Sequence, residues 1–238
     1  MNNIKNQVNN FLESRDKNHR YSSFDYCYNY FYNFYKNDKI NEIGNDNNIE
    51  KSCLHLGFYL ASWGMMRGSS FLLQKNLSIF KNLIQEISRK DSKIYWEIDI
   101  DNYNDENIER LLELKNIIYE SFPENKPSDT LITKIMLGIF GNIPAFDRFF
   151  KDGIKIISKN KISITSVDKI SLNIIKDFYL KNKNVIDKFE IKTLDFQNLN
   201  YTNIKYTKAK VIDMYGFMTG YNNYLQLKNA KPTKNPPR

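Results

Sequence analysis

The sequence predicts one all-α globular domain of about eight helices, and three observations support this prediction. Apolar residues recur at helical spacing along most of the chain, alternating strand patterns are nearly absent, and the connecting segments are short. The 238 residues, 41% of them hydrophobic, are enough for one core. We expect residues 1–228 to form the domain and the basic, proline-rich residues 229–238 to form a flexible tail.

In the first half, apolar periodicity predicts helices over residues 2–14, 25–36, 49–66, 71–88 and 106–122. Serine pairs precede the second helix, at Ser22 and Ser23, and the fourth, at Ser69 and Ser70, where a serine side chain can cap the first turn. The segment 93–105 is ambiguous, because it can form either a short strand or a loop.

In the second half, the same pattern predicts helices over residues 130–140, 145–154, 166–189 and 206–220. Ser128 or Asp129 is expected to cap the first of these, Pro144 to begin the second, Gly153 to end it, and Ser166 to cap the third. Residues 155–166 can be extended or form a loop, and residues 191–200 are expected to be a connector.

The formal net charge of +8 has two explanations. An anionic partner such as DNA is one. The other is coding composition, because the chain is rich in Lys, Asn and Ile, which A/T-rich codons specify. The seven arginines are more informative than the lysines, since the planar guanidinium binds phosphate and carboxylate in a way that lysine cannot copy.

The sequence also excludes some classes of protein. No apolar run approaches the roughly 20 residues of a membrane span, and the N-terminus does not read as a secretory signal. The cysteines, Cys27 and Cys53, lie in apolar segments, as expected for buried thiols of a reduced, cytoplasmic protein. With two His and two Cys, and no phosphate-binding or dinucleotide-binding glycine pattern, we expect neither a metal nor a cofactor.

The stretch SDTLITKIMLGIFGNIPAFDRFFKDGI, residues 128–154, predicts an apolar helix, a break at a glycine and an aspartate that opens the next helix. This segment resembles the second half of the core motif of the helix-hairpin-helix DNA glycosylases. The matching positions are Thr133, Leu137, Gly141, Pro144 and Asp147. Otherwise the chain resembles bacterial all-helical proteins.

The resemblance implies a helix-hairpin-helix glycosylase-like bundle, association with DNA and a catalytic role for Asp147. The family's phosphate-gripping hairpin glycines have no match before Thr133, and Lys134 stands after the threonine, away from the lysine of the lyase members. The resemblance therefore implies the scaffold and Asp147, with or without catalysis. The structural alternative is that Asp147 only caps the short helix it precedes.

Two further segments offer candidate binding residues. Arg67 lies between Gly64 and Gly68, and a helix beginning at Ser69 or Ser70 would direct its N–H groups to the same place, which together would bind an anion. The alternative is that Arg67 caps the preceding helix.

In the last helix, Lys208 and Lys210 are candidates for phosphate binding, as is Arg148 near Asp147. Asp213 lies on an apolar face and needs a partner if it is buried, so we expect a structural ion pair with Arg148 or Arg67.

These observations lead to two main hypotheses. The first is a nucleic-acid-associated protein on a glycosylase-like scaffold, with Arg67, Asp147, Arg148 and Lys210 in one groove. The second is a non-enzymatic protein that binds another protein, such as a defence accessory factor, with Arg67, Asp147 and Asp213 buried together. A metal-dependent hydrolase built on Asp25, Asp147 and Asp213 is a third and weaker alternative.

Overall fold

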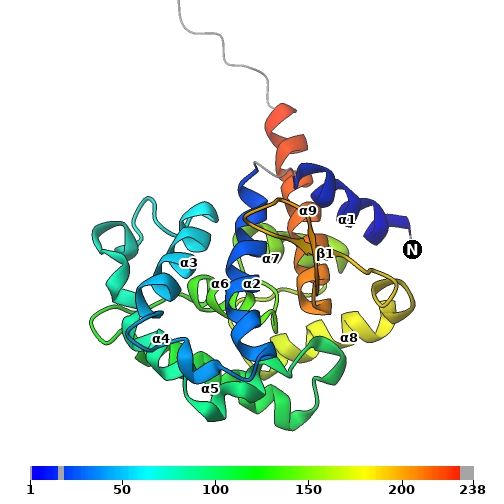
Figure 1. Cartoon of the computed structure of the whole chain (residues 1–238). Coiled ribbons are helices and arrows are strands. Elements are labelled where there is room, and N and C mark those ends of the chain that lie inside the picture. The colour runs from blue at the N-terminus through cyan, green and yellow to red at the C-terminus, as the bar shows by residue number, and fades with distance from the viewer. Residues whose placement is uncertain (1, 16–18, 231–238) are drawn as a thin grey trace, which may run out of the picture.

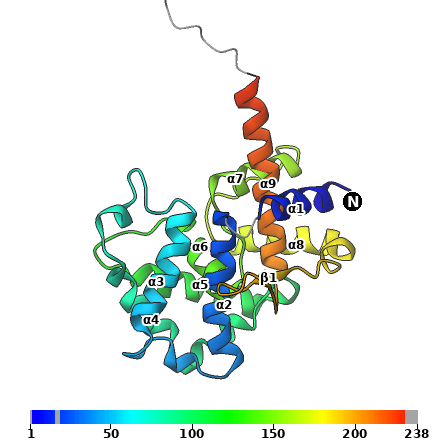
Figure 2. The same ribbon diagram turned by 45° about the horizontal axis from the view of Figure 1, so that its top comes forward.

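The computed structural model describes residues 2–15 and 19–230 of the chain. Helix α9 (Lys208–Asn229) is the organising element, because its residues from Ala209 to Gly220 are all buried. Helices α1 (Asn2–Ser14), α7 (Arg148–Ile157) and α8 (Lys169–Ile186) pack against it, while its C-terminal end projects from the molecule (Figures 1 and 2).

A second buried helix, α6 (Asp129–Phe140), is the centre of the other half. Helices α2 (Ser23–Lys36), α3 (Ile49–Ser62) and α5 (Asp105–Glu120) pack against it, and α4 (Lys81–Ile87) packs on α3 and α5. Buried apolar residues from both halves form one hydrophobic core. The chain is therefore a mostly helical single domain, as the apolar periodicity predicted. Among the described helices, none combines the length and apolarity needed to cross a membrane.

The connector predicted over residues 191–200 is wrong in part, because the chain forms an antiparallel hairpin there. Strand β1 (Lys192–Leu194) pairs with β2 (Tyr201–Lys205). Two side chains of α2 hold β1: Asn29 donates to the Leu194 carbonyl at 2.8 Å, and Asp25 accepts from the Leu194 N–H at 3.0 Å. Contacts with α2, a helix distant in sequence, therefore help to hold the strands in place.

The helix predicted over residues 71–88 is also wrong in part. Two short 3-10 helices, Phe71–Gln74 and Leu77–Phe80, precede α4. Ser70 accepts a hydrogen bond from the Leu72 N–H, and Asn76 accepts one from the Ser78 N–H, so these side chains compete with a continuous helix. The ambiguous segment 93–105 is neither strand nor plain loop. It lies mostly in 3-10 helices over Lys90–Trp96 and Ile100–Asn102.

Helix α7 differs from its predicted bounds at both ends. It begins at Arg148, after the Asp147 cap, and Pro144 lies in the preceding turn. Gly153 lies inside the helix and does not end it. A Cβ at Gly153 would lie 1.9 Å from the carbonyl oxygen of Gly216, so this glycine permits α7 and α9 to approach closely. Asp168, rather than Ser166, caps α8, and Ser166 donates a hydrogen bond to Asp168.

Candidate functional site

An open cavity of about 630 Å³ lies where the end of α3 meets the first turns of α6 and α7 and the middle of α9. Its walls come from five separate stretches of the chain. The lining residues are Arg20, Ala61, Ser62, Trp63, Gly64, Met65, Arg67, Thr130, Lys134, Asp147, Arg148, Phe149 and Phe217. Asp147 is the one acidic residue among them.

Asp147 is held at the cavity by the turn that joins α6 to α7. Gly141 ends α6 in a left-handed conformation with φ of 69°, which glycine adopts without strain. The turn is then fixed to α6 in two places, because Phe146 accepts a hydrogen bond from Thr130 and donates one to Thr133, at 2.9 and 2.8 Å. Asp147 Oδ1 accepts from the Phe150 N–H at 2.9 Å and caps α7.

The second carboxylate oxygen of Asp147 pairs with Lys134, whose Nζ lies 3.3 Å away. Lys134 Nζ also donates to the Trp63 carbonyl at 3.1 Å. The Lys134 side chain is 4% exposed and that of Asp147 is 15% exposed, so this pair forms the floor of the cavity. Burial lowers the pKa of Lys134, and the charge of Asp147 opposes that change.

A second ion pair lies beneath the first. Lys210 Nζ is 2.8 Å from Asp213 Oδ2, and both side chains are buried. Asp213 Oδ1 accepts from the Ala145 N–H at 3.0 Å, which ties α9 to the turn before Asp147. The predicted arginine partner of Asp213 is therefore wrong, since a lysine one helical turn earlier takes that place. Both ion pairs line an internal cavity of about 10 Å³, close to the space of one water molecule.

Aromatic rings form one wall of the open cavity. The Trp63 ring stacks on Tyr21 with 5.0 Å between centroids, and Phe217 meets it edge-on at 5.6 Å. The Arg20 guanidinium lies over the same indole at 5.1 Å, and its Nη1 donates to the Ser62 carbonyl at 2.9 Å. Trp63 Nε1 is buried and has no hydrogen-bond partner in the described residues.

Arg67 and Arg148 lie at the rim. The Arg67 guanidinium folds back over Gly64, where a Cβ would lie 2.8 Å from Nε, so glycine leaves room for it. The Arg67 side chain is exposed, and its guanidinium makes no hydrogen bond or ion pair with any described residue, although the Arg67 carbonyl accepts from the Ser70 N–H at 3.2 Å. Arg148 has a 73% exposed side chain, 3.6 Å from Asp152 and packed over the Tyr224 ring. Neither guanidinium is fixed by a buried partner.

The structure therefore brings together part of the predicted site. Arg67, Asp147 and Arg148 line the open cavity, whereas Lys210 lies below it and is buried. Lys208 is elsewhere, paired with Asp101 at 2.8 Å. Lys208 therefore does not line the open cavity with the other predicted residues.

Ser69 and Ser70 do not begin an α-helix, so the predicted helix start at these serines is wrong. Ser70 caps a four-residue 3-10 helix and donates to the Met65 carbonyl at 2.6 Å. Both serines instead line a neighbouring cavity next to Arg67.

Sequence reasoning missed Lys134, Arg20 and the Trp63–Phe217 wall as parts of this site. Lys134 was considered only as a match to the lysine of the lyase members, and its position after Thr133 did not fit that match. One signal was available: a lysine in the middle of an apolar helix needs a buried partner. The same rule applies to Lys210. For Arg20, no local pattern shows that its side chain reaches the end of α3.

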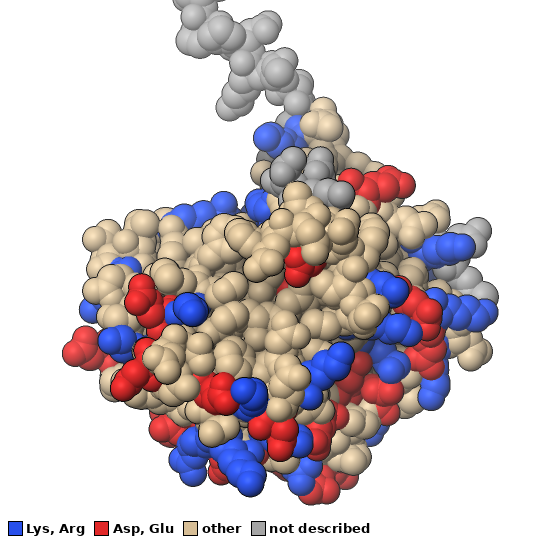
Figure 3. Space-filling model, viewed as in Figure 1, with Lys and Arg blue, Asp and Glu red and all other residues tan. Residues whose placement is uncertain are grey.

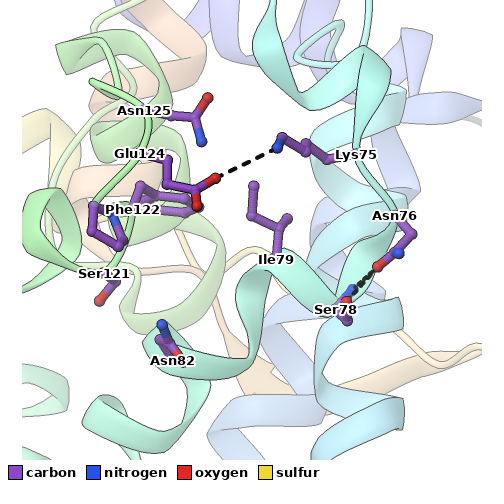
Figure 4. Close-up of a pocket in the computed structure, with 10 residues that line it drawn as sticks. Lys75, Asn76, Ser78, Ile79, Asn82, Ser121, Phe122, Glu124 and Asn125 are labelled. Carbon is purple, nitrogen blue, oxygen red and sulfur yellow. Dashed lines mark hydrogen bonds and ion pairs between the residues drawn. The ribbon is translucent and has the colours of Figure 1, made fainter.

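Asp25 belongs to a different place in the molecule. It lies in a buried cluster with Arg15 and Tyr206 against the hairpin, so it does not join Asp147 and Asp213. Another hollow, of about 330 Å³, lies between residues 75–82 and 121–125, where Lys75 reaches towards Glu124 at 3.8 Å (Figure 4). None of the predicted site residues lines it.

No family model, curated protein or solved structure matches the chain.

The balance of charges differs between the face of the molecule in Figure 3 and the lining of the open cavity. On the face shown in Figure 3, basic and acidic side chains are interspersed around an uncharged central area. The net positive charge is therefore not gathered on that face. Around the open cavity the balance is different, because four basic residues line it with a single acidic one.

Proposed function

We propose that this protein associates with nucleic acid and that the cavity above Lys134 and Asp147 receives part of a strand. The observation that carries the proposal is the convergence of Arg20, Arg67 and Arg148, from distant parts of the chain, on one open cavity with an aromatic wall. Guanidinium groups bind phosphate through several N–H donors, and indole and phenyl rings stack on bases. A volume of about 630 Å³ lies within the usual range of ligand sites.

The proposed scaffold is glycosylase-like, and local geometry supports it. An apolar helix ends at the left-handed Gly141, a turn containing Pro144 follows, and Asp147 opens the next helix at the cavity floor. In such a scaffold an aspartate would stabilise positive charge on the sugar as the bond to a base breaks. We propose Asp147 for that role if the protein has excision activity. Lys134 would hold the carboxylate in position.

The first experiment measures binding. Fluorescence anisotropy with single-stranded and duplex DNA is expected to detect binding that weakens steeply with salt. Arg67→Ala and Arg148→Ala should each weaken binding about tenfold, because a charge-assisted hydrogen bond contributes roughly 1.5–3 kcal/mol. Arg89→Ala is the matched control, since Arg89 is exposed, pairs with Glu86 and Asp91, and does not line the cavity. Equal effects of all three substitutions would contradict the proposed location.

The second experiment separates binding from chemistry. Duplexes with damaged or mismatched bases are incubated with the protein, and strand breakage at abasic sites is measured after alkali. Asp147→Asn should abolish excision and leave binding within about twofold, because asparagine also caps a helix well. Excision that persists unchanged in Asp147→Asn would exclude the catalytic role. Binding without any excision by the wild-type protein would support a scaffold that lacks catalysis.

Protein binding remains the alternative, and one observation favours it. A mainly apolar groove of about 360 Å³ runs between α1, α7, α8 and α9, lined in part by Ile157, Ile162 and Phe178. Apolar grooves of this kind accept side chains of a partner. If no DNA or RNA binds even at low salt, the nucleic-acid proposal fails and this alternative becomes the better one.

A further inference from the structure

A second cavity, of about 550 Å³, adjoins the first. The two cavities share Gly64, Met65 and Arg67, so the Arg67 side chain stands between them. The second cavity is otherwise lined by Gly68, Ser69, Ser70, Phe71, Lys126, Ser128 and Leu131. No carboxylate belongs to this lining. The two cavities are therefore neighbours, with the Arg67 guanidinium between them.

Two cations of the second cavity are free to bind an anion. Arg67 and Lys126 are both exposed, and neither forms an ion pair within the described part of the chain. The nearby Glu124 is directed to Lys75 instead, at 3.8 Å. Lys134 and Lys210 form ion pairs within the fold. Arg67 and Lys126 do not, so a ligand that binds them breaks no ion pair among the described residues.

The loop that separates the cavities also presents polar groups. Gly64 and Gly68 have φ of 76° and 60°, and a Cβ at Gly68 would meet no atom within 4 Å, so this part of the loop is open. The N–H groups of Met66, Arg67, Gly68 and Ser69 have no acceptor among the described residues. Exposed N–H groups and guanidinium groups are both suited to phosphate oxygens.

Each cavity combines a cation with an aromatic ring. Trp63 and Phe217 line the first, and Phe71, which packs edge-on against Phe122 at 5.8 Å, lines the second. A cation and an aromatic ring therefore lie on each side of Arg67, as expected of a site that binds successive nucleotides. In a strand, phosphates alternate with bases that stack on aromatic side chains.

Resting on the proposed function, we infer that the two cavities form one track for a nucleic-acid strand of at least two nucleotides. Arg67 contacts the phosphate between the two nucleotides, and Lys126 and Ser69 contact the next phosphate. The ligand class is thus an oligonucleotide rather than a mononucleotide. Ser70 is excluded from direct contact, because its hydroxyl is already used by Met65 and Leu72.

The test compares ligands of increasing length. Binding of thymidine 5′-monophosphate and of single-stranded oligothymidylates of two to eight nucleotides is measured by calorimetry at fixed salt. Affinity should rise at least tenfold between one nucleotide and three. Lys126→Ala should weaken oligonucleotide binding about tenfold and leave mononucleotide binding unchanged, whereas Arg67→Ala should weaken both. Because Lys126 is exposed and unpaired, its substitution should not affect folding.

Lys75→Ala is the matched control, because Lys75 lies on the same side of the fold, pairs with Glu124 and lines neither cavity. It should change oligonucleotide affinity by less than twofold. Equal effects of Lys75→Ala and Lys126→Ala, or no gain of affinity with length, would overturn the track while Arg67→Ala and Arg148→Ala still report on the first cavity. Binding of duplex alone would also overturn it. Failure of every nucleic acid to bind would instead remove the proposed function itself.

Discussion

At the scale of single residues, the most informative feature is the contact between Lys134 and Asp147. A lysine buried to 4% exposure keeps its charge only with partners, and the 3.3 Å contact with Asp147 and the 3.1 Å hydrogen bond to the Trp63 carbonyl supply them. The carboxylate oxygen at this contact is also the part of Asp147 not used by the helix cap. Any ligand in the cavity that approaches Asp147 therefore approaches a lysine as well.

The first prediction concerns the pKa of Lys134. Burial lowers this pKa and Asp147 raises it, so Asp147→Asn should lower it further. NMR of lysine ammonium or Cε signals, assigned with Lys134→Met, measures the titration. Asp152→Asn is the control, because Asp152 is half exposed and pairs with Arg148 instead. An unchanged or higher pKa in Asp147→Asn would contradict the assigned electrostatic coupling.

At the scale of elements, the packing of α7 on α9 positions the site. Gly153 and Gly220 permit this approach, since a Cβ at Gly153 would lie 1.9 Å from the Gly216 carbonyl oxygen and one at Gly220 would lie 2.0 Å from that of Phe149. Phe149 and Phe217, on the two helices, meet edge-on at 5.5 Å and both line the cavity. The helix pair therefore sets the shape of that wall.

The second prediction follows from this packing. Gly153→Ala should lower the free energy of unfolding by about 1–3 kcal/mol or more, because the backbone of α9 cannot yield as a flexible side chain would. Chemical denaturation followed by circular dichroism measures the change. Gly68→Ala is the comparison, because a Cβ at Gly68 would meet no atom within 4 Å although the φ of Gly68 is 60°. This substitution should lower the free energy of unfolding by roughly 1–2 kcal/mol through backbone strain alone. A stabilised Gly153→Ala would show that the helices are not in this close contact.

The packing of α7 on α9 also shows why the sequence predicts where helices lie but not how they pack on one another. The apolar periodicity of residues 2–14 and 106–122 predicted α1 and α5 to within two residues, because that signal is local. Gly153 was predicted to end a helix, although its role is close approach to another helix. The hairpin over residues 192–205 was missed for a similar reason, since Asn29 and Asp25 of α2 specify it.

At the scale of the whole molecule, the sequence likewise predicted only part of the candidate site. The sequence predicted Asp147, Arg67 and Arg148, and these line one cavity. It did not predict that Lys134 and Arg20 would join them. Whether residues as far apart in sequence as Arg20 and Arg148 line one cavity depends on how α3, α6 and α7 pack, and no local pattern carries that information.

A buried cluster around Asp25 also acts at this scale, by joining segments from both ends of the chain. Arg15, which follows α1, lies 3.3 Å from Asp25 of α2 and donates to the Lys192 carbonyl at 3.2 Å. Its guanidinium also donates to Tyr206 at 2.6 Å, and Tyr206 donates to Asp25. The cluster therefore links the end of α1, helix α2, the hairpin and the residue Tyr206 just before α9.

The last prediction is a pH dependence that this cluster imposes on stability. Burial raises the pKa of Asp25 to about 6 from 3.8, although Arg15 and Tyr206 act in the opposite direction. Between pH 4 and 6 the folded state then binds more protons at this site than the unfolded state. The contribution of Asp25 to the free energy of unfolding is therefore full below pH 4 and is lost as the pH rises through 6.

Asp25→Asn removes this titration while keeping the shape of the side chain. The difference in unfolding free energy, wild type minus variant, should fall by roughly 2–3 kcal/mol from pH 4 to pH 6 and then remain constant. Urea denaturation at pH 4, 5, 6 and 7 measures it, with the exposed Asp91→Asn as the matched control. A difference that rises with pH would mean that the Arg15 charge outweighs burial, and that Asp25 ionises more readily in the fold than in the unfolded chain.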